Sequence, residues 1–318
     1  MNESEEALLE AIRRVLSEPS PNVVLGPGDD AAVLSVGSGE LLFTTDALVE
    51  EVHFSRRWIT ARELGAKAIN VSLSDIAAMA GSPRAAVCAL TLPEGIDAAW
   101  AMELLGGMRE ACGEHGVALV GGNLSGGPCV QIVVAVLGEV APGRAVTRSG
   151  ARPGDRVVVT GDLGGSAAGL RLARSATGAL EAGGREAVAR HLRPRARIGE
   201  AAILARHGAT AMIDVSDGLA VDLTRICEAA GVGVRLRLAD LPVGPAAEVD
   251  DALAGGEDYE LVATLPDDAA VEAARAELRE TLGVPLTAIG EIVASGRSAI
   301  DAAGLERPLE PAGWDHFG

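Results

Sequence analysis

The chain has 318 residues, of which 48% are hydrophobic and 23% are charged, and its formal net charge is −18. This length suits two domains better than one, since single domains commonly hold about 100–150 residues. An acidic surface repels the phosphates of nucleic acids and anionic membranes, so neither is expected as a partner. The first 18 residues lack the basic start of a signal peptide, and no apolar run is long enough to span a membrane, which predicts a cytoplasmic protein.

Lysine and cysteine usage narrows the chemistry further. Lys67 is the only lysine and follows an alanine, so a Walker-type phosphate loop, which needs a lysine after glycine, is absent from the sequence. Any nucleotide must therefore be bound by another device. The four cysteines show no C-x-x-C pair or zinc-type spacing, which favours buried reduced thiols.

Strand and helix patterns alternate along the chain. In the first half, β-prone apolar runs and helical spacing predict strands at 41–45, 85–92, 118–120 and 130–137, with helices at 61–79 and 98–115. A turn-rich connector lies between Pro142 and Asp155. Beyond it we expect strands at 156–160, 211–213, 234–238, 261–264 and 287–292, and helices at 195–207, 219–230 and 269–282. We predict two α/β domains, residues 1–145 and 146–318.

Carboxylates recur where these apolar segments end. They occur in the turn GPGDD (26–30), in TTD (44–46), in the helical stretch NVSLSD (70–75), in IDVSDG (213–218) and in GGEDY (255–259). Any one of them could be an Asx-turn or a helix N-cap, and Asp217 could simply cap the helix that follows it. Their repetition favours a shared site, because α/β proteins assemble binding sites at the ends of strands.

Converging carboxylates repel one another unless cations neutralise them. Oxygen ligands from Asp, Thr and Ser suit hard cations, and Mg²⁺ is usually held by one or two carboxylates together with substrate phosphates. Calcium binding without catalysis is the competing interpretation. No twelve-residue EF-hand loop is present and the clusters lie far apart in the sequence, which favours magnesium.

Other polar residues are weaker candidates taken singly. The segments 120–123 and 161–166 are glycine-rich and could present backbone N–H groups to phosphate, although neither fits G-x-G-x-x-G. Arg148 could clamp a phosphate or could be a solvated linker residue. His53 lies beside acidic residues and could be structural. Trp314 could pack on the domain or stack on a cationic ring.

Eight stretches in order resemble the thiamine-monophosphate kinase family, from about Leu8 to the last residue: GPGDDAAVL, TTDALVEEVHF, NVSLSDIAAMAGSP, VTRSGARPGD, HLRPRARI, IDVSDGL, GGEDYEL and GWDHFG. The wider superfamily includes aminoimidazole ribonucleotide synthetase, selenophosphate synthetase and the hydrogenase-maturation dehydratase. The resemblance implies that superfamily's two-domain α+β fold, with the N-terminal domains of a homodimer pairing into a β-barrel and a C-terminal α/β domain completing the cleft.

The resemblance also implies residue roles. The positions matching the family's metal ligands are Asp30, Thr44, Thr45, Asp46, Asp75, Asp214 and Asp217. Those matching its ATP contacts are Gly121, Gly122, Arg148 and Ser216. His53, Asp258 and Trp314 fall at or beside its thiamine-phosphate contacts. Asn123 stands where the family usually has a metal-binding Asp; its amide oxygen can still coordinate Mg²⁺, but one negative charge is lost.

The implied reaction is the Mg²⁺-dependent transfer of the γ-phosphate of ATP to thiamine monophosphate, the last step in making thiamine diphosphate. An ionised phosphate acceptor needs no catalytic base, so we expect catalysis by positioning and charge neutralisation, with Asp46, Asp75 and Arg148 central. The enzymatic alternative is another ATP-using member of the superfamily, such as aminoimidazole ribonucleotide synthetase. The alternative of another class is a catalytically silent thiamine-phosphate-binding protein, suggested by Asn123.

Overall fold

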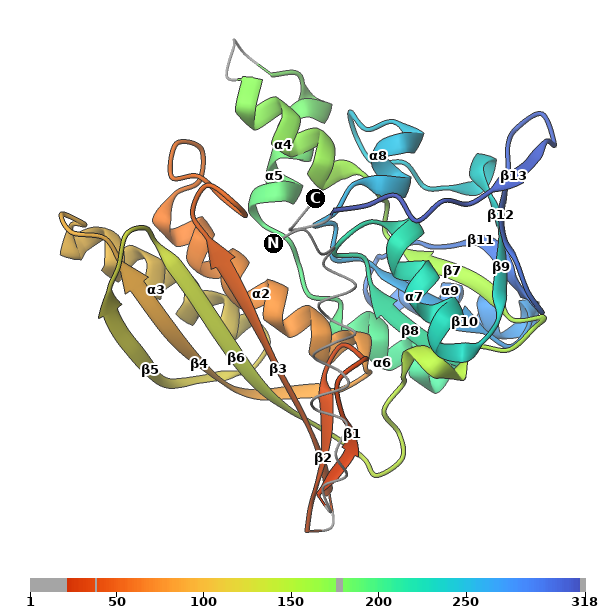
Figure 1. The fold of residues 1–318 in the computed structure, drawn as a ribbon, viewed down its shortest axis with the longest axis horizontal. Coiled ribbons are helices and arrows are strands. Elements are labelled where there is room, and N and C mark those ends of the chain that lie inside the picture. The colour runs from red at the N-terminus through yellow and green to blue at the C-terminus, as the bar shows by residue number, and fades with distance from the viewer. Residues whose placement is uncertain (1–21, 38, 176–179, 315–318) are drawn as a thin grey trace, which may run out of the picture.

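The computed structural model describes residues 22–37, 39–175 and 180–314. The acidic N-terminal segment and residues 315–318 of the GWDHFG stretch lie outside the described residues. Two mixed sheets carry helices and stand side by side, with helix α2 (Ala61–Ala78) running between them (Figure 1). The expected α+β architecture in two halves is confirmed.

The first sheet has the strand order β1-β2-β3-β6-β4-β5. All neighbours are antiparallel except β4 and β5. Helices α2 and α3 (Ala98–Glu114) cover one of its faces (Figure 1). The strands are β1 (Val23–Leu25), β2 (Ala32–Val36), β3 (Gly39–Val49), β4 (Ser82–Leu92), β5 (Ala118–Gly126) and β6 (Gln131–Val140).

Helix α2 is apolar around most of its circumference. Such a helix is buried on all sides. On one side α2 contacts β3 and α3, and on the other side it contacts β8 (Ala211–Asp214) and α6 (Ile198–Arg206) of the second half. It begins at Thr60, whose hydroxyl accepts from the Glu63 amide while the Glu63 carboxylate accepts from the Thr60 amide. This capping box fixes the start of the helix. Every side chain that α2 points inward is therefore held rigidly.

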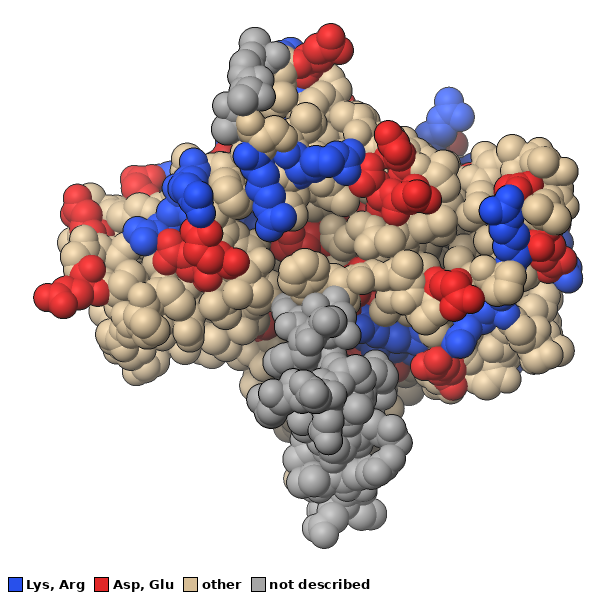
Figure 2. All heavy atoms as spheres, turned by 45° about the horizontal axis from the view of Figure 1, so that its top comes forward, with Lys and Arg blue, Asp and Glu red and all other residues tan. Residues whose placement is uncertain are grey.

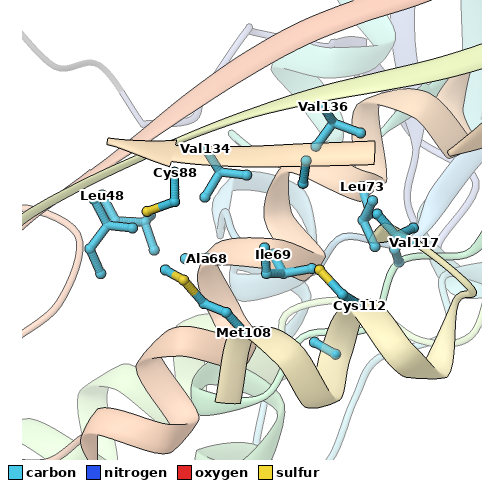
Figure 3. Packing of buried hydrophobic residues seen from close by; sticks show 14 of the residues in the cluster. Leu48, Ala68, Ile69, Leu73, Cys88, Met108, Cys112, Val117, Val134 and Val136 are labelled. Carbon is cyan, nitrogen blue, oxygen red and sulfur yellow. The ribbon is translucent and has the colours of Figure 1, made fainter. Parts of the chain in front are cut away.

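The core of the first half lies between the sheet and these two helices. Leu48 and Val134 from the strands pack towards Ile69 of α2 and Met108 of α3 (Figure 3). Cys88 and Cys112 belong to this core, and Cys227 is buried in the second half. All four cysteines are free, as the spacing predicted.

The second sheet has the order β13-β12-β9-β11-β7-β10-β8. Its strands are β7 (Arg156–Thr160), β8 (Ala211–Asp214), β9 (Gly233–Arg237), β10 (Leu261–Leu265), β11 (Leu286–Val293), β12 (Arg297–Ile300) and β13 (Glu306–Pro308). Its helices are α4 (Gly165–Ser175), α5 (Ala182–Leu192), α6 (Ile198–Arg206), α7 (Leu219–Ala230), α8 (Val249–Ala254) and α9 (Asp268–Thr281).

Two strands extend beyond the predicted ends. Asp46 does not close its strand, because β3 continues to Val49 in antiparallel register with β6. Likewise β5 runs through Gly121-Gly122-Asn123, which the sequence indicates as a loop. Parallel pairing with β4 holds these residues extended, and a Cβ on Gly122 would lie 1.8 Å from the Cys88 carbonyl oxygen. The glycine is needed for this close backbone approach.

Charged groups of opposite sign are interleaved on the face seen in Figure 2. Many of the arginines pair with carboxylates, as Arg156 does with Asp268 and Arg171 with Asp251. On this face, therefore, the acidic residues form small groups beside basic residues rather than one large negative patch. In the described ranges, no helix has the length and apolarity required to cross a membrane.

Candidate active site

Three carboxylates from distant parts of the chain converge beside α2. Asp30 follows β1, Asp75 lies on α2 and Asp214 ends β8, and one oxygen of each lies within 4.8 Å of the others. Asp30 and Asp214 are buried. The Thr44 hydroxyl donates to the Asp75 carboxylate, which orients it. This is the arrangement that the acidic strand ends suggest, assembled from both halves of the molecule.

The electrostatics of this cluster are unfavourable without a cation. Burial, and then the neighbouring carboxylates, raises the pKa of Asp75 and of Asp214 well above the usual value. Burial also raises the pKa of Asp46 to about 6, with Asp30 and Asp217 adding to the effect. Buried groups of one sign can all ionise only when a positive charge compensates them.

The donors present fit a hard divalent cation. All of them are oxygens, which Mg²⁺ and Ca²⁺ prefer. Among the described residues, Asp46 Oδ2 is one of few buried side-chain polar atoms without a hydrogen-bond partner. An unpartnered buried carboxylate oxygen is costly unless it coordinates a cation.

Arg148 already compensates part of this charge. Its guanidinium donates two hydrogen bonds to Asp30, at 2.8 Å and 3.1 Å, and its backbone N–H donates to Asp29 at 3.0 Å. Burial and the adjacent Asp30 nonetheless raise the pKa of Asp29 to about 6. Arg148 lies within the connector between the two halves, so this pairing fastens the connector to the carboxylate cluster. It is not a solvated linker residue.

Thr44 and Thr45 point to opposite faces of β3. Thr44 shares the inner face with Asp46, whereas the Thr45 hydroxyl donates to the Val134 carbonyl at 3.0 Å. Alternation along a strand requires this separation. The Thr45 hydroxyl is therefore committed to the sheet rather than to the carboxylates.

The turn after β8 presents Ser216 and Asp217. The Asp222 carboxylate of α7 accepts the backbone N–H groups of Ser216, Asp217 and Gly218, each at 3.1 Å. Arg225 Nη1 lies 2.7 Å from both Asp217 and Asp222. Asp222 rather than Asp217 thus satisfies the start of the helix, which leaves one side of Asp217 facing the cleft. The sequence pattern gave no separate signal for Asp222.

A cleft of about 1060 Å³ adjoins the carboxylates. Its lining contains six of the residues singled out in the sequence: Thr45, Asp46, His53, Ser216, Asp217 and Trp314. His53 Nδ1 accepts from the Val49 backbone N–H at 3.1 Å, which orients the ring. The Trp314 side chain is 52% exposed, and its backbone N–H donates to the Asp217 carbonyl. The lining is polar and charged as well as apolar, and a large concave cavity is the usual place of a ligand site.

Glu257 lines this cleft, whereas the sequence resemblance indicates its neighbour Asp258 for contact with thiamine phosphate. The Asp258 carboxylate accepts from the Gly164 and Ser166 amides at 2.6 Å and 3.0 Å, at the start of α4. That turn was a candidate phosphate-binding loop, and an internal carboxylate fills it. Asp258 is absent from the cleft lining, so Glu257 rather than Asp258 faces the cleft.

The glycines and Asn123 of β5 stand apart from the other candidates. Three strand spacings separate β5 from β3, which carries Asp46. In register, Gly121 lies opposite Val87 and Asn123 opposite Ala89, on the face of the sheet away from α2. Within one chain, therefore, Gly121, Gly122 and Asn123 do not join the carboxylate cluster.

Comparisons with known proteins point to one family. The family models for AIR synthase related protein match residues 28–140 (N-terminal domain) and 152–302 (C-terminal domain). The thiamine-monophosphate kinase of Escherichia coli K12 is 38% identical over 313 residues, covering 93% of each chain. That of Aquifex aeolicus is 35% identical over 300 residues, covering 91% of this chain and 92% of its own.

Solved structures give the same result. One described as AaThiL complexed with AMPPCP and TMP superposes with a TM-score of 0.83 at 33% identity, covering 98% of this chain and 97% of its own. The hydrogenase maturation protein HypE in complex with ATP has a TM-score of 0.72 but only 21% identity, so it supports the fold alone. The chain therefore belongs to the thiamine-monophosphate kinase family of the AIR synthase related proteins.

Proposed function

We propose that this chain transfers the γ-phosphate of ATP to thiamine monophosphate, giving thiamine diphosphate and ADP. The observation that carries the proposal is the cleft itself. A buried oxygen-only cluster adjoins it, and Trp314 and Glu257 line its wall. Relatives named thiamine-monophosphate kinase at 32–40% identity, and the related structure holding AMPPCP and TMP, support the same substrates.

The reaction we propose is a direct in-line displacement. A terminal phosphate oxygen of thiamine monophosphate attacks the γ-phosphorus, and the bond to the bridging oxygen of ADP breaks. The acceptor oxygen is already ionised near neutral pH, so no base is required. The protein accordingly needs only to position the two phosphates and to neutralise their charge. We assign this to Arg148, which supplies positive charge, and to Asp46 and Asp75, which would hold the Mg²⁺ that supplies the rest.

Mg²⁺ would be held by Asp30, Asp46, Asp75 and Asp214, with Asp217 at the edge of the cleft. When bound, it supplies positive charge to the phosphate oxygens and offsets the crowded carboxylates. Thr44 keeps Asp75 oriented for this task, and Arg148 keeps Asp30 oriented. We propose Trp314, His53 and Glu257 for the thiamine moiety, because a tryptophan face and a carboxylate both favour a cationic ring.

We further propose that the N-terminal sheets of two chains pair into a barrel. The face of the first sheet away from α2 is largely apolar, with Thr45 between Phe43 and Ala47 of β3. On it, β3, β6 and β4 contribute the ladder of Phe43, Ala47, Val133, Ala135, Leu137, Val87 and Ala89. Phe43 is 48% and Val87 41% exposed. Apolar surface of this extent usually marks an interface. This pairing would place Gly121 and Asn123 of β5 where the two chains meet. We also propose that the boundary between the two domains lies at residues 145–146.

The dimer can be tested with matched arginine substitutions. Val87→Arg puts a charge in the centre of the apolar face, whereas Met102→Arg puts one on the exposed side of α3. We expect light scattering to show a monomer for Val87→Arg and a dimer for Met102→Arg and the native chain. A dimer that tolerates Val87→Arg would contradict this interface.

The first test of function is purified protein with ATP, Mg²⁺ and thiamine monophosphate, followed by chromatography. Equal amounts of ADP and thiamine diphosphate are expected. ADP with inorganic phosphate alone would indicate another acceptor within the superfamily. Binding of thiamine monophosphate without formation of ADP would indicate a silent binding protein.

The cytoplasmic location stays a prediction from the sequence.

A further inference from the structure

Lys67, the only lysine of the chain, is fully buried on α2. Its ammonium lies 3.0 Å from Glu257 Oε1 and donates to the His191 carbonyl at 3.1 Å. These partners come from three segments: α2, the end of α5 and the loop before β10. Burying an ammonium is unfavourable unless it is paired and hydrogen-bonded, and both conditions hold here.

The Glu257 carboxylate is held from two sides. Its Oε2 lies 3.3 Å from His191 Nδ1, and the Ser166 hydroxyl lies 3.0 Å from the same nitrogen. Its backbone has φ of 65°, a left-handed value unusual for glutamate, and its N–H donates to the Ser216 carbonyl. Strain of this kind persists only where surrounding contacts enforce it, and it is concentrated at ligand sites.

Glu257 faces the cleft, whereas Lys67 is not in the lining. The lysine can therefore influence a ligand only through the groups that it contacts, which are the Glu257 carboxylate and His191, and both of these residues line the cleft. Burial acts to raise the pKa of Glu257, but the Lys67 charge and His191 outweigh it and lower that pKa. The carboxylate thus stands ionised in the wall that Trp314 and His53 also form.

We propose that Lys67 is a positioning residue that fixes the orientation of the Glu257 carboxylate for the thiamine moiety of the substrate. This inference rests on the proposed function for the identity of the ligand. It assigns Lys67 no contact with substrate, and its effect passes entirely through Glu257. A purely structural alternative would make Lys67 only a link between the two halves of the molecule.

The first test separates the two substrates. Lys67→Met keeps the length of the side chain and removes the charge. We expect the KM for thiamine monophosphate to rise at least about tenfold, since small displacements in a site lose large factors, while the KM for ATP changes by less than about twofold. Arg193→Met is the matched control, because Arg193 also joins the halves but pairs with Glu63 rather than with Glu257 and is not in the cleft lining. Equal increases in both KM values would overturn the proposal.

The second test is a double-mutant cycle with Glu257→Gln. If Lys67 acts through Glu257, Lys67→Met has no further effect on the KM for thiamine monophosphate in the Glu257→Gln background. Additive effects would overturn the proposal. Each single variant leaves one charge of the buried pair without its partner, whereas the double variant carries no unpaired charge of this pair. If Lys67→Met alone unfolds, Lys67→Arg replaces Lys67→Met in both tests.

Thiamine monophosphate binding, measured by calorimetry without ATP, keeps this inference distinct from the proposed function. A native chain that binds thiamine monophosphate but forms no thiamine diphosphate would refute the kinase activity. The inference would then still require weaker binding by Lys67→Met, and unchanged binding would overturn it.

Discussion

Arg148 holds Asp30 by two parallel hydrogen bonds, at 2.8 Å and 3.1 Å, across 118 residues of sequence. The pair places a permanent positive charge beside the three carboxylates of the cluster. A planar guanidinium can hold one carboxylate in a fixed orientation and still present donors to a phosphate, which an ammonium cannot do as well.

Replacing Arg148 should therefore impair phosphate transfer specifically. We expect Arg148→Met to lower kcat/KM for ATP by about 10²-fold or more, the usual effect of removing one donor to developing charge. Binding of thiamine monophosphate in calorimetry should be preserved. Arg156→Met, which removes a surface arginine paired with Asp268, is the control. Equal kinetics for both variants would contradict the role of Arg148.

Asp214→Asn should raise the stability of the metal-free protein and lower its activity. Removing one of three crowded, buried carboxylates relieves their repulsion, so the metal-free variant should unfold at a higher temperature than the native chain. The same change should abolish most turnover and the stabilisation that Mg²⁺ gives to the native chain. Thermal unfolding with chelator and with Mg²⁺ measures both. A lower unfolding temperature in chelator would argue against a crowded anionic site.

His191 should make stability depend on pH. Burial, with the charges of Lys67 on α2 and Arg174 on α4, lowers the pKa of His191 to about 4, although Glu257 opposes the shift. The unfolded chain then binds the extra proton as pH falls through the ordinary histidine value, so stability is complete above about pH 6.5 and is lost below it. From pH 7 to pH 5 the loss from this group should be about 2 kcal/mol.

The measurement is the difference in unfolding free energy between the native chain and His191→Gln at each pH. As the pH falls, the unfolding free energy of the native chain should decrease relative to that of His191→Gln. A pH-independent difference for His191→Gln would rule out a neutral buried imidazole.

Trp314 should contribute to substrate affinity rather than to chemistry. Its exposed ring lines the cleft, and contact of a desolvated aromatic face with a cation is worth about 0.5–2 kcal/mol. We expect Trp314→Ala to raise the KM for thiamine monophosphate about tenfold with little change in kcat, and Trp314→Phe to retain most of the affinity. A fall in kcat at unchanged KM would place Trp314 near the reacting phosphates instead.

Much of the secondary structure could be predicted from local pattern. The apolar strand 156–160 and the helix 219–230 have the expected bounds, because a strand of β-branched residues and an amphipathic helix are specified within the segment. The short strands β1 and β2 and the helices α4 and α5 were not predicted. The two strands are only three and five residues long, and the two helices contain glycines, so packing against other segments decides these elements more than their own periodicity does.

The kinds of chemical group at the site can be predicted from the amino-acid sequence: carboxylates repeated at segment ends, no Walker lysine, and a tryptophan near the end of the chain. Which of these groups meet depends on how the chain is packed. Asp30, Asp75 and Asp214 converge because α2 and β8 are packed together, and β3 alternation turns the Thr45 hydroxyl away. Glu257 and Asp258 are adjacent in sequence, yet one faces the cleft and the other caps α4. Local periodicity cannot carry that choice, because side-chain direction depends on long-range register and on backbone dihedral angles that only the packed chain enforces.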